Sequence, residues 1–181
     1  MTESANEAGL SKVIRALAFA AHKHRDQRRK DPEASPYVNH PIALAAILAD
    51  EAGVTDVDTL CAAILHDTVE DTQTSEAEIR EAFGNEIANV VAEVTDDKSL
   101  PKDVRKQLQI DHAPHLSRKA RLVKLADKIA NLRDMAASPP ADWPLERRRD
   151  YFEWGAKVVA GIRGSHPVLE ALFDEAYEKR P

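Results

Sequence analysis

Four side chains of types that bind metals lie at the edge of an apolar helical pattern or interrupt one. These residues are His40, His66, Asp67 and Asp127. His66 and Asp67 follow the apolar run 60–65, and Asp127 lies inside the dense apolar pattern of 122–132. A carboxylate among core positions is costly unless it is paired. Two imidazole nitrogens and two carboxylate oxygens, with room for water, suit Mn²⁺, Fe²⁺ or Zn²⁺ better than a closed structural zinc site. We therefore predict an open, catalytic metal centre.

Two further acids, Glu70 and Asp71, lie about one helical turn beyond His66 and Asp67. In a helix the four-residue spacing stacks His66 with Glu70 and Asp67 with Asp71. Neighbouring carboxylates in a partly desolvated site bind a cation or take up protons. A bound divalent ion lowers the pKa of water and polarises a phosphoryl oxygen, and hydrolysis of a phosphate ester can use both effects.

Each of these observations also has a structural explanation. Acids are common at solvated helix ends, and a His-Asp pair is a weak motif by itself. Lys124 and Lys128 are close enough in sequence to form an ion pair with Asp127. Asn131, one turn further on, can hydrogen-bond either Asp127 or a ligand.

The elements that must position these residues are helices, because apolar residues recur at intervals of three and four and β-branched alternation is nearly absent. The first apolar stripe comprises Leu10, Val13, Ile14, Leu17, Ala18 and Ala21. Capping boxes are predicted at Ser4 with Glu7, Thr55 with Asp58, and Ser75 with Glu78. Ser117 is predicted to start the helix that carries Asp127, Pro144 and Pro167 to start the last two helices, and residues 95–102 to form a polar loop. We expect an all-α fold.

The length of 181 residues, or 20.0 kDa, fits one domain spanning 1–181, in which we expect 1–9 to be a flexible N-terminus. The net charge of −6 argues against broad nucleic-acid binding. No stretch approaches the ~20 apolar residues of a membrane span, and the polar start has no secretory pattern, so we expect a cytoplasmic protein. The single cysteine, Cys61, is expected to be a small core residue.

Several longer motifs resemble the HD-domain metal-dependent phosphohydrolases, and among them the small stand-alone (p)ppGpp hydrolases called MESH1-like proteins. They are His24-Arg25-Asp26-Gln27-Arg28-Arg29-Lys30-Asp31-Pro32-Glu33, Tyr37-Val38-Asn39-His40-Pro41, His66-Asp67-Thr68-Val69-Glu70-Asp71-Thr72, and Leu122-Val123-Lys124-Leu125-Ala126-Asp127-Lys128 with Asn131-Leu132-Arg133-Asp134. The resemblance runs from about the first helix to the last. It implies a single HD-type helical bundle.

The resemblance also implies residue roles. His40, His66, Asp67 and Asp127 would bind one Mn²⁺, and Glu70 and Asp71 would act on the attacking water. Arg29 and Lys30 would border the nucleotide base, and Asn131 and Tyr151 would face the ribose and phosphate region. Lys98, Trp143 and Arg147 are candidate ligand contacts only. The implied reaction converts (p)ppGpp to GDP or GTP and pyrophosphate.

Two alternatives remain open at this stage. Some MESH1-like proteins remove the 2′-phosphate of NADPH, and a catalytically silent nucleotide-binding module would keep its metal for structure. The intact Glu70-Asp71 pair speaks against the silent module, because a structural site needs no extra acids beside the metal. Larger relatives add a synthetase domain, for which we expect no room in 181 residues. The sequence does not indicate an oligomeric state.

Overall fold

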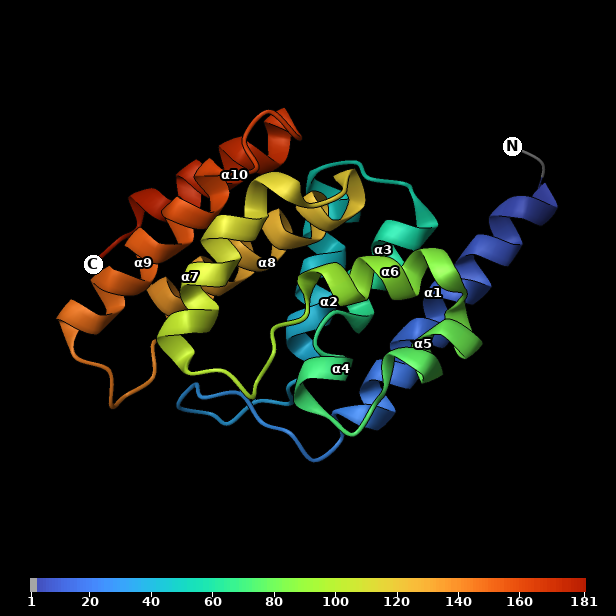
Figure 1. Cartoon of the computed structure of the whole chain (residues 1–181), viewed down its shortest axis with the longest axis horizontal. Coiled ribbons are helices and arrows are strands. Elements are labelled where there is room, and N and C mark those ends of the chain that lie inside the picture. Colours follow the sequence, from blue (N-terminus) through green and yellow to red (C-terminus); the bar gives the residue numbers. More distant parts are fainter. Residues whose placement is uncertain (1–2) are drawn as a thin grey trace.

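Helices make up the regular secondary structure of residues 3–181, which are the residues that the computed structural model describes (Figure 1). In chain order they are α1 (Glu3–Lys23), α2 (Asn39–Ala46), the π-helical η1 (Ile47–Glu51), α3 (Val57–Leu65), α4 (Thr68–Asp71), α5 (Glu76–Phe83), α6 (Asn85–Val94), α7 (Lys102–His112), the 3₁₀ turn η2 (Ala113–His115), α8 (Arg118–Ala137), α9 (Leu145–Ala160) and α10 (Pro167–Glu178). Within these residues the extended structure is one isolated bridge between Arg28 and Pro36, and no strand forms. The all-α fold class is confirmed.

The central element is α8, which packs against α2, α3, α6, α9 and α10. Its middle section is buried on every side, since each residue from Leu122 to Ala130 is buried. Leu125, Ile129 and Leu132 have no exposed surface, and Phe152 of α9 and Phe173 of α10 are almost completely buried. Because α8 is surrounded by apolar side chains, it carries Asp127 into the interior at a fixed position.

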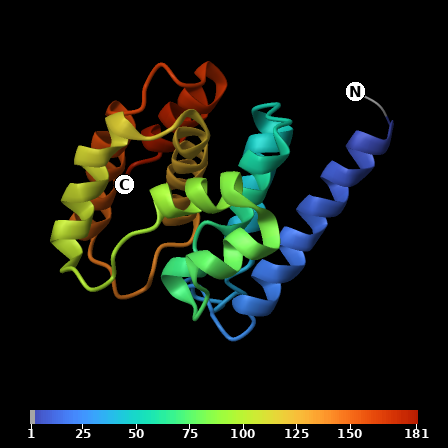
Figure 2. The ribbon, with the colours of Figure 1, turned by 45° about the vertical axis from the view of Figure 1, so that its right-hand side comes forward.

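The first helix lies along one edge of the molecule and contacts α3 (Figure 2). Its buried face comprises Ala16 and Ala20, with Val13 and Leu17 half-buried beside them. The predicted stripe was therefore wrong in part, because Leu10 is 64% exposed and Ile14 is 55% exposed. The fully buried positions of α1 are thus small alanines, and two of its larger apolar side chains lie on an exposed side of the helix.

The predicted helix starts are mostly confirmed. Ser75 accepts a hydrogen bond from the backbone N–H of Glu78, and Ser117 accepts one from that of Ala120. Pro144 directly precedes α9, and Pro167 is the first residue of α10. The cap of α3 was predicted one residue too early, because Asp56, rather than Thr55, accepts from the N–H of Thr59.

The stretch 60–72, whose four-residue spacing we interpreted as that of a helix, is not one continuous helix. It breaks at His66 and Asp67, where α3 ends and the one-turn α4 begins. The Thr68 hydroxyl donates to the Leu65 carbonyl at 2.6 Å, and His66 Nδ1 lies 2.8 Å from the Ala63 carbonyl. Polar side chains thus satisfy carbonyls at the helix end, and the break turns Asp67 toward His66.

One helix was missed by the sequence reasoning. α7 begins at Lys102, immediately after the polar loop, and it contains no fully buried residue. Its weak apolar pattern explains the miss, since an amphipathic helix is recognised by a buried stripe. α7 packs against α9 and supplies Arg105 and Gln109 to the neighbourhood of the site.

The first helix begins earlier in the chain than the sequence predicted. α1 begins at Glu3 and includes residues up to 9 that we expected to precede it, so Ser4 lies within the helix rather than at its start. Residues 1 and 2 lie outside the described residues. Among residues 3–181, none of the helices is both long and apolar enough to cross a bilayer. The flexible N-terminus, the single domain and the cytoplasmic location stay predictions.

Candidate metal and catalytic site

His40 of α2 and His66 at the end of α3 bring two buried imidazoles together, with ring centroids 5.3 Å apart. Both residues are at most 5% exposed. His66 Nδ1 is directed at the Ala63 carbonyl, which can only accept, so this nitrogen carries the proton and Nε2 has the lone pair. Donation to a carbonyl of this kind is how metal-binding histidines are commonly oriented.

The Asp67 carboxylate faces both imidazoles. Its Oδ2 lies 2.9 Å from His66 Nε2 and 3.8 Å from His40 Nε2. One ligand atom from each of His40, His66 and Asp67 fits within a group 4.8 Å across. Tyr37 donates its hydroxyl to the same Asp67 oxygen and so fixes the carboxylate from the other side.

Asp127, the fourth predicted ligand, faces the same two imidazoles from α8 but lies outside this group of three. Its Oδ1 lies 3.3 Å from His40 Nε2 and 3.9 Å from His66 Nε2. Asn131 donates to Oδ1 at 2.5 Å, and Lys128 donates to Oδ2 at 3.0 Å. The ion pair that we considered as an alternative therefore exists with Lys128, but it uses the oxygen that is turned away from the imidazoles. Lys124 instead donates to the Val94 carbonyl.

The electrostatics of this cluster fit a cation. Burial lowers the pKa of His66, but Asp67 and Asp127 more than reverse this effect and raise it to about 9. Burial raises the pKa of Asp67, but the two imidazoles outweigh it and hold that pKa below its ordinary value. His66 Nε2 is buried and makes no directed hydrogen bond despite its proximity to Asp67. A proton or a metal ion must separate these lone pairs, and the donor set of nitrogens and carboxylate oxygens suits a divalent metal.

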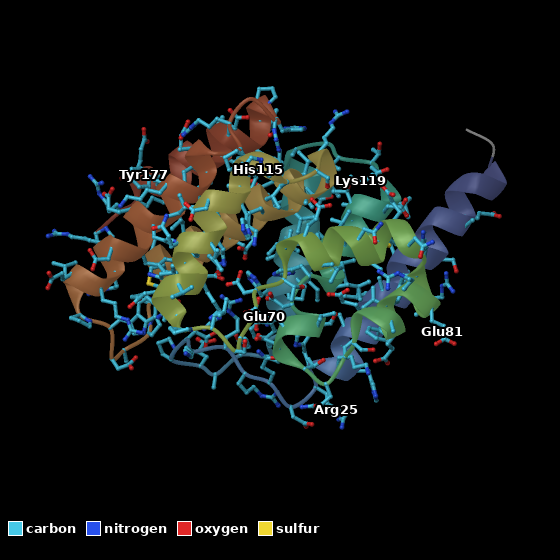
Figure 3. All side chains as sticks on the ribbon, in the orientation of Figure 1. Arg25, Glu70, Glu81, His115, Lys119 and Tyr177 are labelled. Carbon is cyan, nitrogen blue, oxygen red and sulfur yellow. The ribbon has the colours of Figure 1, made fainter. Side chains whose placement is uncertain are left out.

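Glu70 lies on α4, toward the middle of the molecule, whereas Arg25 and Glu81 extend outward at its edge (Figure 3). Its Oε2 accepts the backbone N–H of Asp96 at 3.1 Å, and its Oε1 is 3.7 Å from an Arg105 guanidinium nitrogen. Burial raises the pKa of Glu70 to about 7, with further contributions from the charges of Asp67 and Asp96. A carboxyl with this pKa can exchange a proton near neutral pH.

Asp71, the neighbouring acid, is held on both oxygens. Gln27 donates its side-chain amide to Oδ2 at 2.8 Å, and Lys98 donates to Oδ1. The backbone N–H of Asp71 donates to the Asp67 carbonyl at 2.8 Å, which ties α4 to the predicted metal ligand. Asp71 is thus joined to Asp67 through its backbone, and Glu70 is close enough for the charge of Asp67 to raise its pKa.

A cavity of about 330 Å³ opens against His40. Its wall contains four of the predicted substrate-binding residues, namely Arg29, Lys30, Asn131 and Tyr151. Arg29 donates to Asp134 at 2.5 Å, and the Arg29 backbone N–H donates to the Ser35 carbonyl at 2.9 Å, so the loop after α1 is fixed against α8. A volume of about 330 Å³ is at the lower end of the usual range for small-molecule pockets.

The other three candidate contacts lie elsewhere. Lys98 binds Asp71 and is not in the cavity wall, and Trp143 and Arg147 are also outside it. The Arg147 guanidinium lies 4.0 Å from the centre of the Trp143 ring. The Trp143 ring in turn packs against the Tyr151 ring, with 5.8 Å between the two ring centroids. Trp143 and Arg147 thus support the cavity wall through Tyr151.

Sequence reasoning missed three residues that contact the site, namely Gln27, Tyr37 and Arg105. Gln27 and Tyr37 were visible only as parts of longer motifs, with no charge or apolar anomaly of their own. Arg105 belongs to the helix that the apolar pattern did not reveal. Only tertiary contacts connect these side chains to the acids.

Comparisons with known proteins agree with this geometry. A family model described as "HD domain" matches residues 16–151, which is well over half of the chain. The chain belongs to the HD-domain family. Its relatives within this family include the proteins named "Guanosine-3′,5′-bis(diphosphate) 3′-pyrophosphohydrolase MESH1" from Xenopus tropicalis and Homo sapiens. The Xenopus protein is 53% identical over 91% of this chain and 92% of its own length. The human protein is 52% identical over 94% of this chain and 95% of its own length.

A solved structure agrees as well. The structure described as "A metazoan ortholog of SpoT hydrolyzes ppGpp and plays a role in starvation responses" superposes with a TM-score of 0.91 at 50% identity, covering 93% of this chain and 95% of the other. This HD-domain protein thus groups with the MESH1-like hydrolases across nearly its whole length.

Proposed function

We propose that this HD-domain protein hydrolyses the 3′-pyrophosphate of (p)ppGpp, consuming one water and giving GDP or GTP and pyrophosphate. The observation that carries the proposal is the combination of near full-length identity above 50% to MESH1 hydrolases with an intact His/Asp cluster. The two acids beside the cluster support a catalytic function over simple nucleotide binding.

We propose Mn²⁺ as the resident ion, with His40, His66, Asp67 and Asp127 as its ligands. When bound, a divalent ion supplies a lowered pKa for water and polarisation of a phosphoryl oxygen. The protein fixes the donor atoms beforehand. Ala63 orients His66, Tyr37 holds Asp67, and Asn131 and Lys128 hold Asp127.

Glu70 and Asp71 are assigned to the attacking water. Glu70 is suited to accept a proton from the water because burial has raised its pKa to about 7. Asp71 is suited to orient the water, since its backbone N–H is bonded to the Asp67 carbonyl and both of its carboxylate oxygens accept hydrogen bonds. Arg105 lies near Glu70 and offsets the local excess of acid.

The nucleotide is assigned to the cavity next to His40. Arg29 presents a planar guanidinium that can stack on a purine, a contact that lysine does not provide. Lys30 adds positive charge to the cavity lining, and Asn131 and Tyr151 add polar groups to it. This arrangement holds the base and the reacting phosphate at different ends of one cavity.

The decisive assay loads purified protein with Mn²⁺ and measures pyrophosphate release from ppGpp beside phosphate release from NADPH, at equal enzyme and metal. We expect the higher kcat/KM for ppGpp. A higher value for NADPH would replace the proposed substrate, and no turnover of either would favour a binding module.

Two variants test the assigned acids in the same assay. General acid–base assistance is typically worth ~10²–10⁴-fold in rate. Glu70→Gln and Asp71→Asn should each lose kcat on that order and keep Mn²⁺ and nucleotide binding in calorimetric titrations. Glu81→Gln is a matched control, because Glu81 is an exposed acid on α5 far from the cavity wall. Loss of metal binding in either site variant would move that residue into the ligand set.

A further inference from the structure

His24 and Gln27, in the turn that follows α1, form a hydrogen-bonded pair that leads directly to Asp71. His24 is 2% exposed, and its Nδ1 lies 2.7 Å from Gln27 Oε1. Gln27 Nε2 in turn lies 2.8 Å from Asp71 Oδ2. Neither residue belongs to the metal, acid or substrate-binding sets described above.

The direction of these hydrogen bonds follows from the chemistry of the groups. An ionised carboxylate only accepts, so the Gln27 NH₂ must face Asp71 and the Gln27 carbonyl must face His24. His24 Nδ1 therefore carries the proton. Its Nε2, which has no partner, is then an unused acceptor rather than a buried N–H without an acceptor.

Gln27 is held more firmly than the other partner of Asp71. The Gln27 backbone N–H donates to the His24 carbonyl at 2.9 Å, and its carbonyl accepts from the Tyr37 N–H at 3.1 Å. The rings of His24 and Tyr37 pack with centroids 4.9 Å apart. Lys98, on the opposite oxygen of Asp71, has 48% of its side chain exposed and a long flexible stem.

We propose that Gln27, oriented by His24, is a positioning residue that fixes the Asp71 carboxylate for its action on water. A neutral amide is suited to this task because it sets the direction of the carboxylate without neutralising its charge. The inference rests on the proposed function, since it assumes the assignment of Asp71 to the attacking water.

The kinetic test compares two equivalent substitutions. Gln27→Met removes the amide at similar volume. Gln107→Met is the matched control, because Gln107 Nε2 also donates to an aspartate at 2.8 Å, but on the exposed surface of α7. We expect Gln27→Met to lose about tenfold to 100-fold in kcat for ppGpp, with KM changed by less than about threefold. The control should match wild type.

A second pair of variants tests the role of His24. His24→Asn retains an N–H donor close to the position of Nδ1, whereas His24→Leu removes it. We expect the asparagine variant to keep most of the kcat and the leucine variant to resemble Gln27→Met. Equal kcat in the two variants would overturn the assignment to His24.

A spectroscopic readout is independent of turnover. In metal-free ¹⁵N-labelled protein, the Gln27 side-chain amide signals can be assigned by their absence from Gln27→Met. We expect their exchange with solvent to be slow in wild type and faster in Asp71→Ala and His24→Leu. Exchange that is equally fast in all three proteins, or a Gln27→Met kcat equal to that of the control, would overturn the inference. An inactive wild type would instead overturn the proposed function.

Discussion

Replacing Glu70 by glutamine should change how the stability of the metal-free protein depends on pH. Glu70 is mostly shielded from solvent, with 18% of its side chain exposed, and burial raises its pKa from 4.5 to about 7. The glutamine side chain would keep an oxygen that can accept the Asp96 N–H. The substitution therefore removes the ionisation and leaves the hydrogen bond.

The sign and size of this change in stability follow from the linkage between protonation and folding. The folded protein holds the Glu70 proton more tightly than the unfolded chain does, so this group favours folding below pH 4.5 and loses that contribution as pH rises through 7. A tenfold change in proton affinity corresponds to about 1.4 kcal/mol, so the whole contribution of the raised pKa is about 3 kcal/mol. About 2.5 kcal/mol of it should disappear between pH 5 and pH 8.

The assay is urea unfolding of wild type and Glu70→Gln at pH 5 and pH 8, with a chelator present throughout. The difference in unfolding free energy between the two proteins should move by about 2.5 kcal/mol in favour of the variant at the higher pH. With ordinary urea dependence this corresponds to a relative midpoint shift of about 1 M. The comparison cancels titrations that the two proteins share.

A free-energy difference that is the same at both pH values would refute the reasoning, because it would mean that Glu70 titrates alike in folded and unfolded protein. Asp103→Asn serves as a control. Asp103 is an exposed acid near the start of α7, so its substitution removes one carboxylate at the surface without touching the surroundings of Glu70.

Three further predictions concern metal, ligand and core. Mn²⁺ at about 100 times its Kd should stabilise the fold by about 2.7 kcal/mol, raise the Tm in calorimetry by roughly 5–10 °C and have no such effect on Asp127→Asn. Arg29→Ala should raise KM for ppGpp more than it lowers kcat, because Arg29 lines the cavity proposed for the nucleotide whereas Glu70 and Asp71 do not, and steady-state kinetics will separate the two. Phe152→Ala should lower the unfolding free energy in urea by about 3–5 kcal/mol, since Phe152 is fully buried, and a smaller loss would mean that α9 closes the cavity.

Much of the fold could be predicted because its signals are local. Apolar spacing and capping residues such as Ser75 and Ser117 act within one or two turns, and the structure confirms them. Predictions failed where packing decides between similar local choices. Leu10 and Ile14 are exposed although they continue the apolar spacing of α1, and α7 forms without a buried stripe.

The candidate site also has features that local sequence predicts and features that depend on packing. The sequence by itself determined the donor types at His40, His66, Asp67 and Asp127, because a charged or imidazole group inside an apolar pattern is costly wherever the helix goes. The sequence also showed that Glu70 and Asp71 follow these residues closely, but it did not show that the helix breaks at His66 and Asp67, between α3 and α4.

Only the tertiary structure decided which groups act on those residues. Gln27 and Asp71 are 44 positions apart, and Tyr37 and Asp67 are 30 apart. Their contacts depend on how α1, α2 and α4 pack, and a one-residue change in helix rotation would direct each side chain elsewhere. Hydrogen bonds require donor and acceptor to meet within a few tenths of an ångström, whereas apolar burial tolerates larger shifts. Local pattern therefore determined the chemical groups of the site, and long-range packing determined their orientation.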